Sequence, residues 1–183
     1  MQDLPGLKPG DAPLRATLYA AQAPGDTGVL AVQVIELQRG GQPLQRIEGL
    51  DTQTPASLAP IEALDMNFDG MVDLRLVELR PAGPNTPYLN WLWDNTRQRF
   101  VPSPALDKLS APRFDVRRRQ VVSDWRDGPT RHGTDTYTWR GGSLLPVQRQ
   151  ERLYSAPGRY TLKTYTWSDG GWRLQRSQPG RDE

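Results

Sequence analysis

The segment from residue 65 to residue 73 carries oxygen-bearing side chains at alternate positions around a glycine. In helix–loop–helix calcium sites, ligands stand at positions 1, 3, 5, 7 and 9, position 7 acts through its carbonyl, and Gly at position 6 makes the sharp turn. This spacing selects Asp65, Asn67, Asp69, Met71 and Asp73, with Gly70 at the turn. Calcium takes about 6 to 8 oxygen ligands, so these five nearly complete its shell. The segment predicts a site for Ca²⁺ as cofactor.

The residues around this loop favour strands on both sides rather than helices. Position 12 of the pattern, a bidentate Glu in helix–loop–helix sites, is Leu76. Val72, Leu74 and Leu76 alternate with polar residues, which indicates a half-buried strand. We therefore expect a calcium-binding hairpin loop, like those of integrin-type repeats, in which the ion stiffens the connection. Because Asp, Asn and Gly also crowd ordinary turns, a plain turn is the alternative.

The composition indicates an all-β protein. The 183 residues include 17 Gly, 17 Pro, 6 Trp and 6 Tyr, and they contain no strong apolar run at helical period, which describes short strands separated by turns. We expect an antiparallel meander of hairpins that forms a sandwich or propeller-like barrel. The predicted organisation is an irregular lead-in over residues 1–13, a single domain over 14–178 and a tail over 179–183.

Several hairpins can be placed within this meander. Arg15–Gln22 and Gly28–Leu37 form an opening pair, and residues 88–101 form another around an Asp-Asn turn. Thr136–Trp139, followed by Gly141-Gly142, resembles Thr164–Trp167, followed by Gly170-Gly171, at an offset of 28 residues. Each copy predicts a strand, a tight glycine turn and a second strand. Only residues 104–109 favour a helical turn.

Charge is distributed unevenly along the chain. Residues 1–100 carry 12 acidic and 8 basic residues, whereas residues 101–183 carry 9 acidic and 15 basic residues. Of the 23 bases, 20 are Arg, which forms bidentate contacts with carboxylates and is enriched at interfaces. This distribution favours an acidic partner, although a GC-rich coding sequence would also enrich Arg. Nucleic acid is not expected, because Asp residues interrupt the bases and no recognised nucleic-acid motif is present.

The residue types that carry most enzyme chemistry are scarce. The chain has no Cys and a single His, His132, and it has neither a nucleophile elbow nor a phosphate-cradling loop. We expect no catalytic residues and no enzymatic activity. His132 is expected at an exposed hairpin tip. No apolar run approaches the length of a transmembrane span, and the start lacks the pattern of a leader.

A binding surface is the remaining prediction. Trp and Arg dominate interface hot spots, and the segment between residues 123 and 135 combines both types with turn formers. Its candidate contact residues are Trp125, Arg126, Asp127, Arg131 and His132. The alternative is that Trp125 packs in the core while the charges solvate a loop.

Three segments together resemble a known family. Residues 65–74, 88–100 and 133–144 resemble calcium-binding, lysozyme-inhibitor-like immunity proteins of bacteria, which are relatives of periplasmic inhibitors of i-type lysozyme. The similarity covers about residues 60–155. It implies an all-β, calcium-binding, periplasmic or lipid-anchored protein. Its expected partner is a peptidoglycan-hydrolase effector that rival cells deliver through secretion systems in interbacterial competition.

The resemblance also suggests a contact loop. Lysozyme inhibitors plug the enzyme cleft with a Ser-Gly-x-Tyr loop, which residues 155–160 echo only loosely, so Arg159 and Tyr160 join the expected partner surface. The alternative function is a calcium-dependent glycan or cell-wall binding module, in which Trp91, Trp93 and Trp125 stack on sugars. An exposed row of rings would favour the glycan, whereas buried rings would favour the protein partner.

Overall fold

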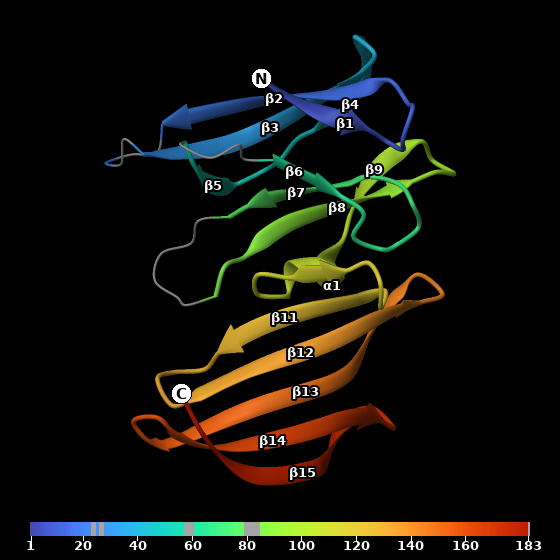
Figure 1. The fold of residues 1–183 in the computed structure, drawn as a ribbon. Coiled ribbons are helices and arrows are strands. Elements are labelled where there is room, and N and C mark those ends of the chain that lie inside the picture. Colours follow the sequence, from blue (N-terminus) through green and yellow to red (C-terminus); the bar gives the residue numbers. More distant parts are fainter. Residues whose placement is uncertain (23–24, 26–27, 57–60, 79–84, 183) are drawn as a thin grey trace. The chain divides into compact units, whose positions relative to one another are not determined.

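The strands pair into three antiparallel sheets, and the chain divides into two compact units, Met1–Lys108 and Leu109–Glu183 (Figure 1). We call these the N-terminal unit and the C-terminal unit. The structure is a computed structural model and describes residues 1–22, 25, 28–56, 61–78 and 85–182. Within that part of the chain the sheets are open, which confirms the all-β antiparallel meander but not a closed barrel.

The N-terminal unit contains two sheets and one helical turn. The first sheet has the order β1-β2-β3-β4, and β5 pairs with β3. Its strands are β1 (Gln2–Gly6), β2 (Pro13–Gln22), β3 (Val29–Arg39), β4 (Gln42–Ile47) and β5 (Thr52–Pro55). The second sheet is a simple meander of β6 (Ile61–Leu64), β7 (Asp73–Val77), β8 (Tyr88–Asp94) and β9 (Arg99–Pro102). The helical turn α1 (Pro104–Asp107) follows, as predicted.

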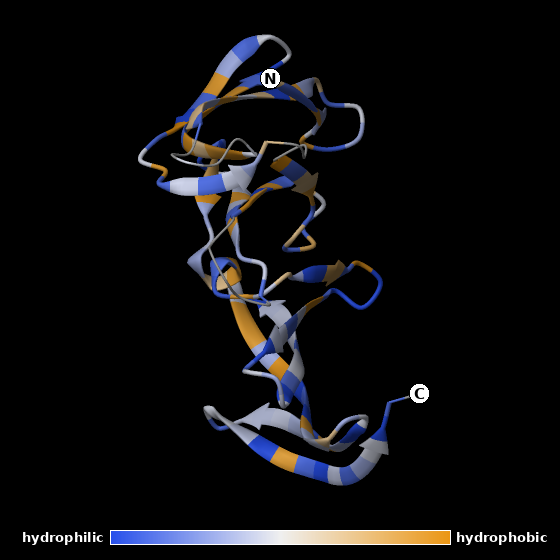
Figure 2. Cartoon of the chain, turned by 90° about the vertical axis from the view of Figure 1, so that its left-hand side faces the viewer, coloured by the Kyte–Doolittle hydropathy of each residue, from blue (hydrophilic) through white to orange (hydrophobic). Residues whose placement is uncertain are grey.

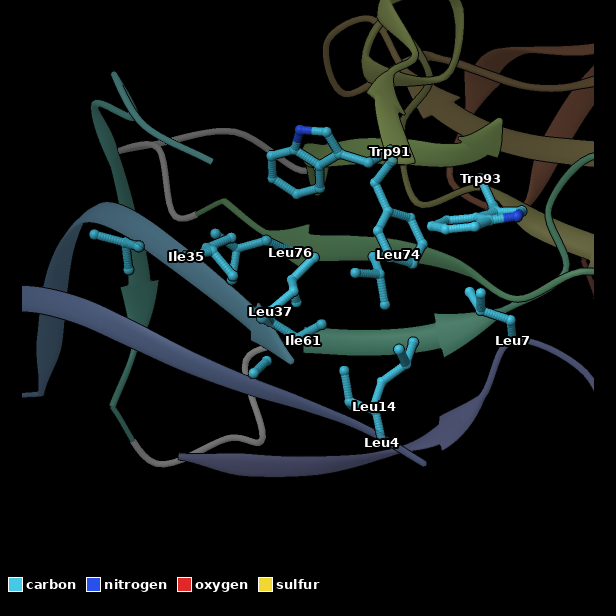
Figure 3. Packing of buried hydrophobic residues seen from close by; sticks show 13 residues of the cluster. Leu4, Leu7, Leu14, Ile35, Leu37, Ile61, Leu74, Leu76, Trp91 and Trp93 are labelled. Atoms are coloured by element: carbon cyan, nitrogen blue, oxygen red, sulfur yellow. The ribbon is translucent and has the colours of Figure 1, made fainter. Parts of the chain in front are cut away.

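These two sheets pack face to face as a sandwich around one apolar cluster. Figure 3 shows Leu14 and Leu37 of the first sheet and Leu74 and Leu76 of the second pointing into the space between them. The period-two pattern of β7 thus puts its leucines on the buried face. The ring of Trp93 packs edge-to-face on Phe100, with centroids 5.0 Å apart. Such a pair stabilises the core beyond its buried area by about 1 kcal/mol.

Two glutamines join the edges of this sandwich. Gln2 in β1 donates to the Ile61 carbonyl at 2.6 Å, and Gln45 in β4 donates to the Phe100 carbonyl at 3.0 Å. Each side-chain oxygen in turn accepts the N–H of the same partner residue. Since Ile61 and Phe100 belong to β6 and β9, the outer strands of the second sheet, both of its edges are partly satisfied by side chains.

The C-terminal unit is one open meander in which each strand pairs with the next along the chain. Its strands are β10 (Arg113–Asp115), β11 (Gln120–Arg126), β12 (Arg131–Arg140), β13 (Ser143–Ala156), β14 (Arg159–Ser168) and β15 (Gly171–Arg181). Most residues of β12 to β15 are half-buried or exposed on both faces. Figure 2 accordingly shows this sheet mainly in hydrophilic and neutral colours.

The internal similarity is confirmed and extends to the irregularities of the sheet. The register shifts between Thr136 and Tyr137 in one hairpin and between Thr164 and Tyr165 in the other, again 28 residues apart. One turn is Gly141-Gly142, with positive φ at both residues, as predicted. The other turn is centred on Asp169-Gly170 rather than Gly170-Gly171, because Ser168 pairs with Gly171. Asp tolerates the left-handed conformation that a type I′ turn needs.

The chain termini differ from the prediction. Residues 2–6 of the expected lead-in form β1, in which Leu4 is buried, and Leu7 just beyond it is buried as well. Pro5 is tolerated because β1 is an outer strand, where a missing N–H need not break the ladder. At the other end β15 continues to Arg181, while residue 183 of the expected tail lies outside the described residues. A single domain over 14–178 was expected, whereas contacts group the described chain into two units.

Candidate functional site

The predicted calcium loop connects β6 to β7, as expected for a hairpin, and side-chain oxygens line its inner turn. The carboxylate of Asp65 accepts the N–H groups of Asp69 at 3.1 Å and Gly70 at 2.9 Å. Asn67 Oδ1 also accepts the Asp69 N–H at 3.0 Å, and Asp69 Oδ1 accepts the Met71 N–H at 2.8 Å. Gly70 takes φ +87°, the left-handed region that favours glycine. The side chains of Asp65, Asn67 and Asp69 therefore bind backbone N–H groups of one turn.

The side chains of this loop alternate between buried and exposed positions. Met66 and Phe68 are buried, whereas Asp65, Asn67 and Asp69 between and beside them are partly or fully exposed. The Val72 N–H donates to the Leu7 carbonyl at 2.8 Å, so the segment after β1 also holds the loop. The loop is thus anchored by two apolar side chains while it presents its polar ones.

Asp73, the last predicted ligand, is fully buried at the start of β7. One of its oxygens accepts the Met66 N–H and the other accepts the Trp93 N–H, both at 2.8 Å. Burial raises the pKa of Asp73 to about 7 against the lowering effect of these two hydrogen bonds, and the charges of Asp69 and Asp65 add to the rise. Asp73 therefore ties the loop to β8, a structural role that its position in the motif does not reveal.

The donor set fits a hard cation in chemistry but only in part in geometry. Asp65, Asn67 and Asp69 supply carboxylate and amide oxygens of the kind that Ca²⁺ prefers. Among the described residues, however, no three His, Cys, Asp or Glu side chains are grouped closely enough to hold a metal. Both oxygens of Asp73 already accept backbone N–H groups, and its side chain is fully buried. Calcium binding stays a prediction.

The predicted partner surface is divided by the strand register. Residues that alternate along a strand point to opposite faces of a sheet, so Trp125 and Arg131 lie on one face, while Arg126, His132 and Tyr160 lie on the other. We call these the Trp125 face and the His132 face. Asp127 lies in the turn between β11 and β12, where it binds Arg131 at 2.8 Å.

Trp125 belongs to a layered aromatic and charged network. Its ring lies on the backbone of Gly133, where an added Cβ would come 2.1 Å from the ring. The guanidinium carbons of Arg131 and Arg149 lie 5.5 and 5.1 Å from the ring centroid, and Arg149 also lies 4.6 Å from the ring of Trp172. Cation–π contacts of this kind contribute about 0.5 to 2 kcal/mol each. Trp125 therefore packs within the sheet, which favours the core alternative over a free hot spot.

Two buried carboxylates complete this network. Asp135 accepts two hydrogen bonds from Arg149, at 2.7 and 2.6 Å, while Glu151 accepts one from Arg131 at 2.5 Å and one from Tyr165 at 2.9 Å. Burial alone would raise the pKa of Glu151, but the hydrogen bonds from Arg131 and Tyr165 outweigh burial and lower it. Both carboxylates thus have an arginine partner, which is how buried charges are tolerated.

His132 does not sit at a hairpin tip, contrary to the prediction. It lies within β12 and is half-buried, because the strand begins at Arg131 and the turn occupies residues 127–130. Its ring centroid is 5.2 Å from that of Tyr154, which is 5.3 Å from that of Tyr160. These three rings form a row across β12, β13 and β14 on the His132 face. The sequence could not show this row, because its members lie far apart along the chain.

Two of the three tryptophans proposed to stack on sugars are buried. Trp91 is 4% exposed and Trp93 is 3% exposed, and both belong to the sandwich core. Trp125 is covered on one side by Gly133. By the criterion of ring exposure, the glycan-binding alternative loses two of its three proposed contacts.

Comparisons with known proteins identify a structure of similar fold. No family model matches the chain, and no curated protein matches it. A solved Xanthomonas structure, described as a type IV secretion system related protein, is 17% identical, with a TM-score of 0.71 over 91% of this chain and 90% of that chain. A Bacteroides fragilis protein of unknown function is 8% identical over 92% of each chain, and its TM-score of 0.33 supports no inference. The chain therefore shares its fold with the Xanthomonas protein.

Proposed function

We propose that this chain is a periplasmic immunity protein that binds and blocks a peptidoglycan-cleaving, lysozyme-like effector of a secretion system. The observation that carries the proposal is the fold likeness, over about nine tenths of both chains, to a protein described as related to a type IV secretion system. The resemblance of residues 60–155 to calcium-binding, lysozyme-inhibitor-like immunity proteins supports the same function independently. In this proposal the chain acts by occlusion and performs no chemistry of its own.

Charge supports a protein partner with an acidic cleft. The C-terminal unit carries 14 Lys and Arg against 8 Asp and Glu, whereas the N-terminal unit carries 9 against 13. Glycan-cleaving clefts require carboxylates for their chemistry, and complementary charge steers association and fixes register. Arg126 and Arg159 are exposed on the C-terminal unit. Since Arg131 is already paired with Glu151 and Asp127, we give it a positioning role.

Calcium has a supporting role in this proposal. Asp65, Asn67, Asp69 and the Met71 carbonyl would hold the ion, with Asp73 behind them. A bound Ca²⁺ neutralises the mutual repulsion of the loop carboxylates and fixes the connection between β6 and β7. Sites with few carboxylates bind calcium in the micromolar to millimolar range, which suits a compartment outside the cytosol. The proposed location is the periplasm, either free or lipid-anchored. In the part of the chain that the structure describes, no helix is long and apolar enough to cross a membrane.

The test is affinity capture with the immobilised chain from a lysate of its source organism supplemented with soluble peptidoglycan fragments. The captured protein is then assayed for peptidoglycan cleavage with and without added chain. We expect recovery of a cell-wall hydrolase and its stoichiometric inhibition. Repeating the capture in chelator, and with the variant Asp65→Asn/Asp69→Asn, tests whether binding of the hydrolase depends on calcium. Recovery of glycan without a protein partner would overturn the proposal and favour the cell-wall binding module.

A further inference from the structure

Two arginines near the end of the C-terminal sheet lie directly opposite each other. The register of β14 and β15 pairs Arg159 with Arg181. Like charges at directly opposed positions of an antiparallel pair destabilise it. Neither arginine has a carboxylate within 4.0 Å among the described residues, whereas Arg131 and Arg149 in the same sheet are both paired. The register therefore places two arginines that have no carboxylate partner among the described residues directly opposite each other.

The backbone that carries this pair is fixed from the opposite face. The ring of Tyr160 lies on Gly180, where an added Cβ would come within 2.4 Å of the ring. The guanidinium of Arg152 lies 5.2 Å from the centroid of the same ring. The nearest acid in the sequence, Asp182, instead accepts from the Tyr154 hydroxyl at 3.2 Å and donates its N–H to the Gly158 carbonyl. The backbone of the pair is thus fixed, and no acid among the described residues neutralises it.

A depression of about 530 Å³ opens at this position. Its lining includes Ser155, Arg159, Thr161, Pro179 and Arg181. By alternation from Tyr160 and Gly180, the two arginines share the Trp125 face with Thr161 and Pro179. Tyr160 and Gly180 line the depression as well, so it is bordered by two guanidinium groups and three hydroxyls, with no acid among them. Such a set of hydrogen-bond donors suits an oxyanion.

We propose that Arg159 and Arg181 form an anion-binding subsite that receives a carboxylate group of the protein partner. This inference rests on the proposed function and names the part of the surface that recognises the effector. A carboxylate accepts bidentate hydrogen bonds from planar guanidinium groups. Its negative charge also offsets the repulsion between the two arginines. Binding therefore relieves a destabilisation of the unbound sheet.

The first experiment uses the purified chain alone with a hexaglutamate peptide and, separately, with inorganic phosphate. Arginine side-chain NMR signals are followed in the wild type, Arg159→Gln, Arg181→Gln and the control Arg140→Gln. Arg140 is an exposed arginine at the β12–β13 turn, remote in register from the subsite. We expect the peptide to shift the signals of Arg159 and Arg181, and each subsite variant to weaken binding roughly tenfold or more. The control should bind as the wild type does.

Three outcomes would overturn the assignment. An equal loss of peptide affinity in Arg140→Gln would mean that the peptide binds a diffuse basic surface and not this pair. Phosphate binding at least as tight as peptide binding would make this a site for small anions instead of a partner carboxylate. A melting temperature of Arg181→Gln no higher than that of the wild type at low salt would show that the pair stores no repulsion.

Capture of the effector separates this inference from the proposed function. If Arg159→Gln/Arg181→Gln loses the peptide but still captures and inhibits a hydrolase as the wild type does, the subsite lies outside the interface and this inference fails alone. If the wild type binds the peptide but captures no hydrolase, the proposed function fails while anion binding stands. Loss of both peptide binding and capture in the double variant, with Arg140→Gln unaffected, is the expected result.

Discussion

The two units of this protein hold antiparallel strands together by different means. The N-terminal unit buries leucines, tryptophans and a phenylalanine between two sheets. The C-terminal sheet instead carries a layer of arginines between aromatic rings and buried carboxylates. Burying a large apolar side chain stabilises by about 1.5 to 3 kcal/mol, whereas a buried ion pair contributes little net stability but is costly to break. We infer that the N-terminal unit owes its stability to buried apolar surface area. The strand register of the C-terminal unit depends on specific ion pairs.

Removal of a core ring should have the largest effect and should be confined to the N-terminal unit. Phe100 is fully buried against Trp93, so Phe100→Ala is expected to cost about 3 to 5 kcal/mol in the free energy of unfolding. Hydrogen exchange read by mass spectrometry will report the loss separately for peptides of each unit. Leu174→Ala is the control, because Leu174 is 53% exposed on the C-terminal sheet. A similar cost for both variants would contradict the contrast between the units.

Breaking one ion pair should affect the C-terminal unit nearly as much. Arg149→Met keeps most of the side-chain length but leaves Asp135 buried without its charged partner, with only the weak hydrogen bond from the Tyr137 hydroxyl remaining. We expect a cost of about 3 kcal/mol, measured by denaturant unfolding, with exchange increased across β12 and β13. The double variant Asp135→Leu/Arg149→Met removes both charges and should recover most of this loss. A single variant as stable as the wild type would mean that apolar contacts hold this sheet too.

Calcium removal should sharpen the contrast, since the proposed ion lies in the N-terminal unit alone. With free calcium at about one hundred times its dissociation constant, binding stabilises the folded state by about 2.7 kcal/mol. A chelator should therefore lower the melting temperature and increase exchange in residues 61–77, while β11 to β15 are unchanged. Asp65→Asn/Asp69→Asn should lack the calcium response. Equal loss of protection in both units, or none, would argue against a stabilising ion in this loop.

Alkaline pH should have the smallest effect and should act on the C-terminal unit. Burial, followed by the charge of Asp135 and the hydrogen bond to it, raises the pKa of Tyr137 from 10.0 to about 12. The folded state therefore holds this proton more tightly than the unfolded state does. The stabilisation is complete below pH 10 and is lost as the pH rises to about 12. Tyrosinate absorbance combined with unfolding will test this, and Tyr137→Phe should show a flatter decline in stability over the same range.

The sequence predicted local features well, because alternation and turn chemistry act over a few residues. The β6–β7 hairpin, the two copies offset by 28 residues and the helical turn at Pro104–Asp107 were all predicted in place. β1 was missed, since Pro5 and Gly6 suggested irregular chain while Leu4 gains its burial only from packing. The second glycine turn was predicted one residue too late, at Gly170-Gly171 instead of Asp169-Gly170, because two neighbouring glycines offered two possible turns.

The site was harder to predict, because it depends on which residues face each other across strands. Nothing in the sequence distinguished Arg149, which lies between two tryptophans, from the other arginines. The predicted partner residues were neighbours in sequence, yet strand alternation separates Arg131 from His132 onto opposite faces. Arg181 could be matched with Arg159 only from the register of β14 and β15, which the sequence alone did not supply.

The strand order also bears on how copies of this chain behave at high concentration. An open sheet presents unpaired backbone groups along its last strand, where another sheet could dock. β15 carries Arg173, Arg176, Pro179 and Arg181, whereas β10 at the other end has only 3 residues. Proline removes a donor from the edge, and guanidinium groups keep their charge in acid. Two such edges repel each other, and this resistance to fibrous self-association will weaken with salt but not with acid.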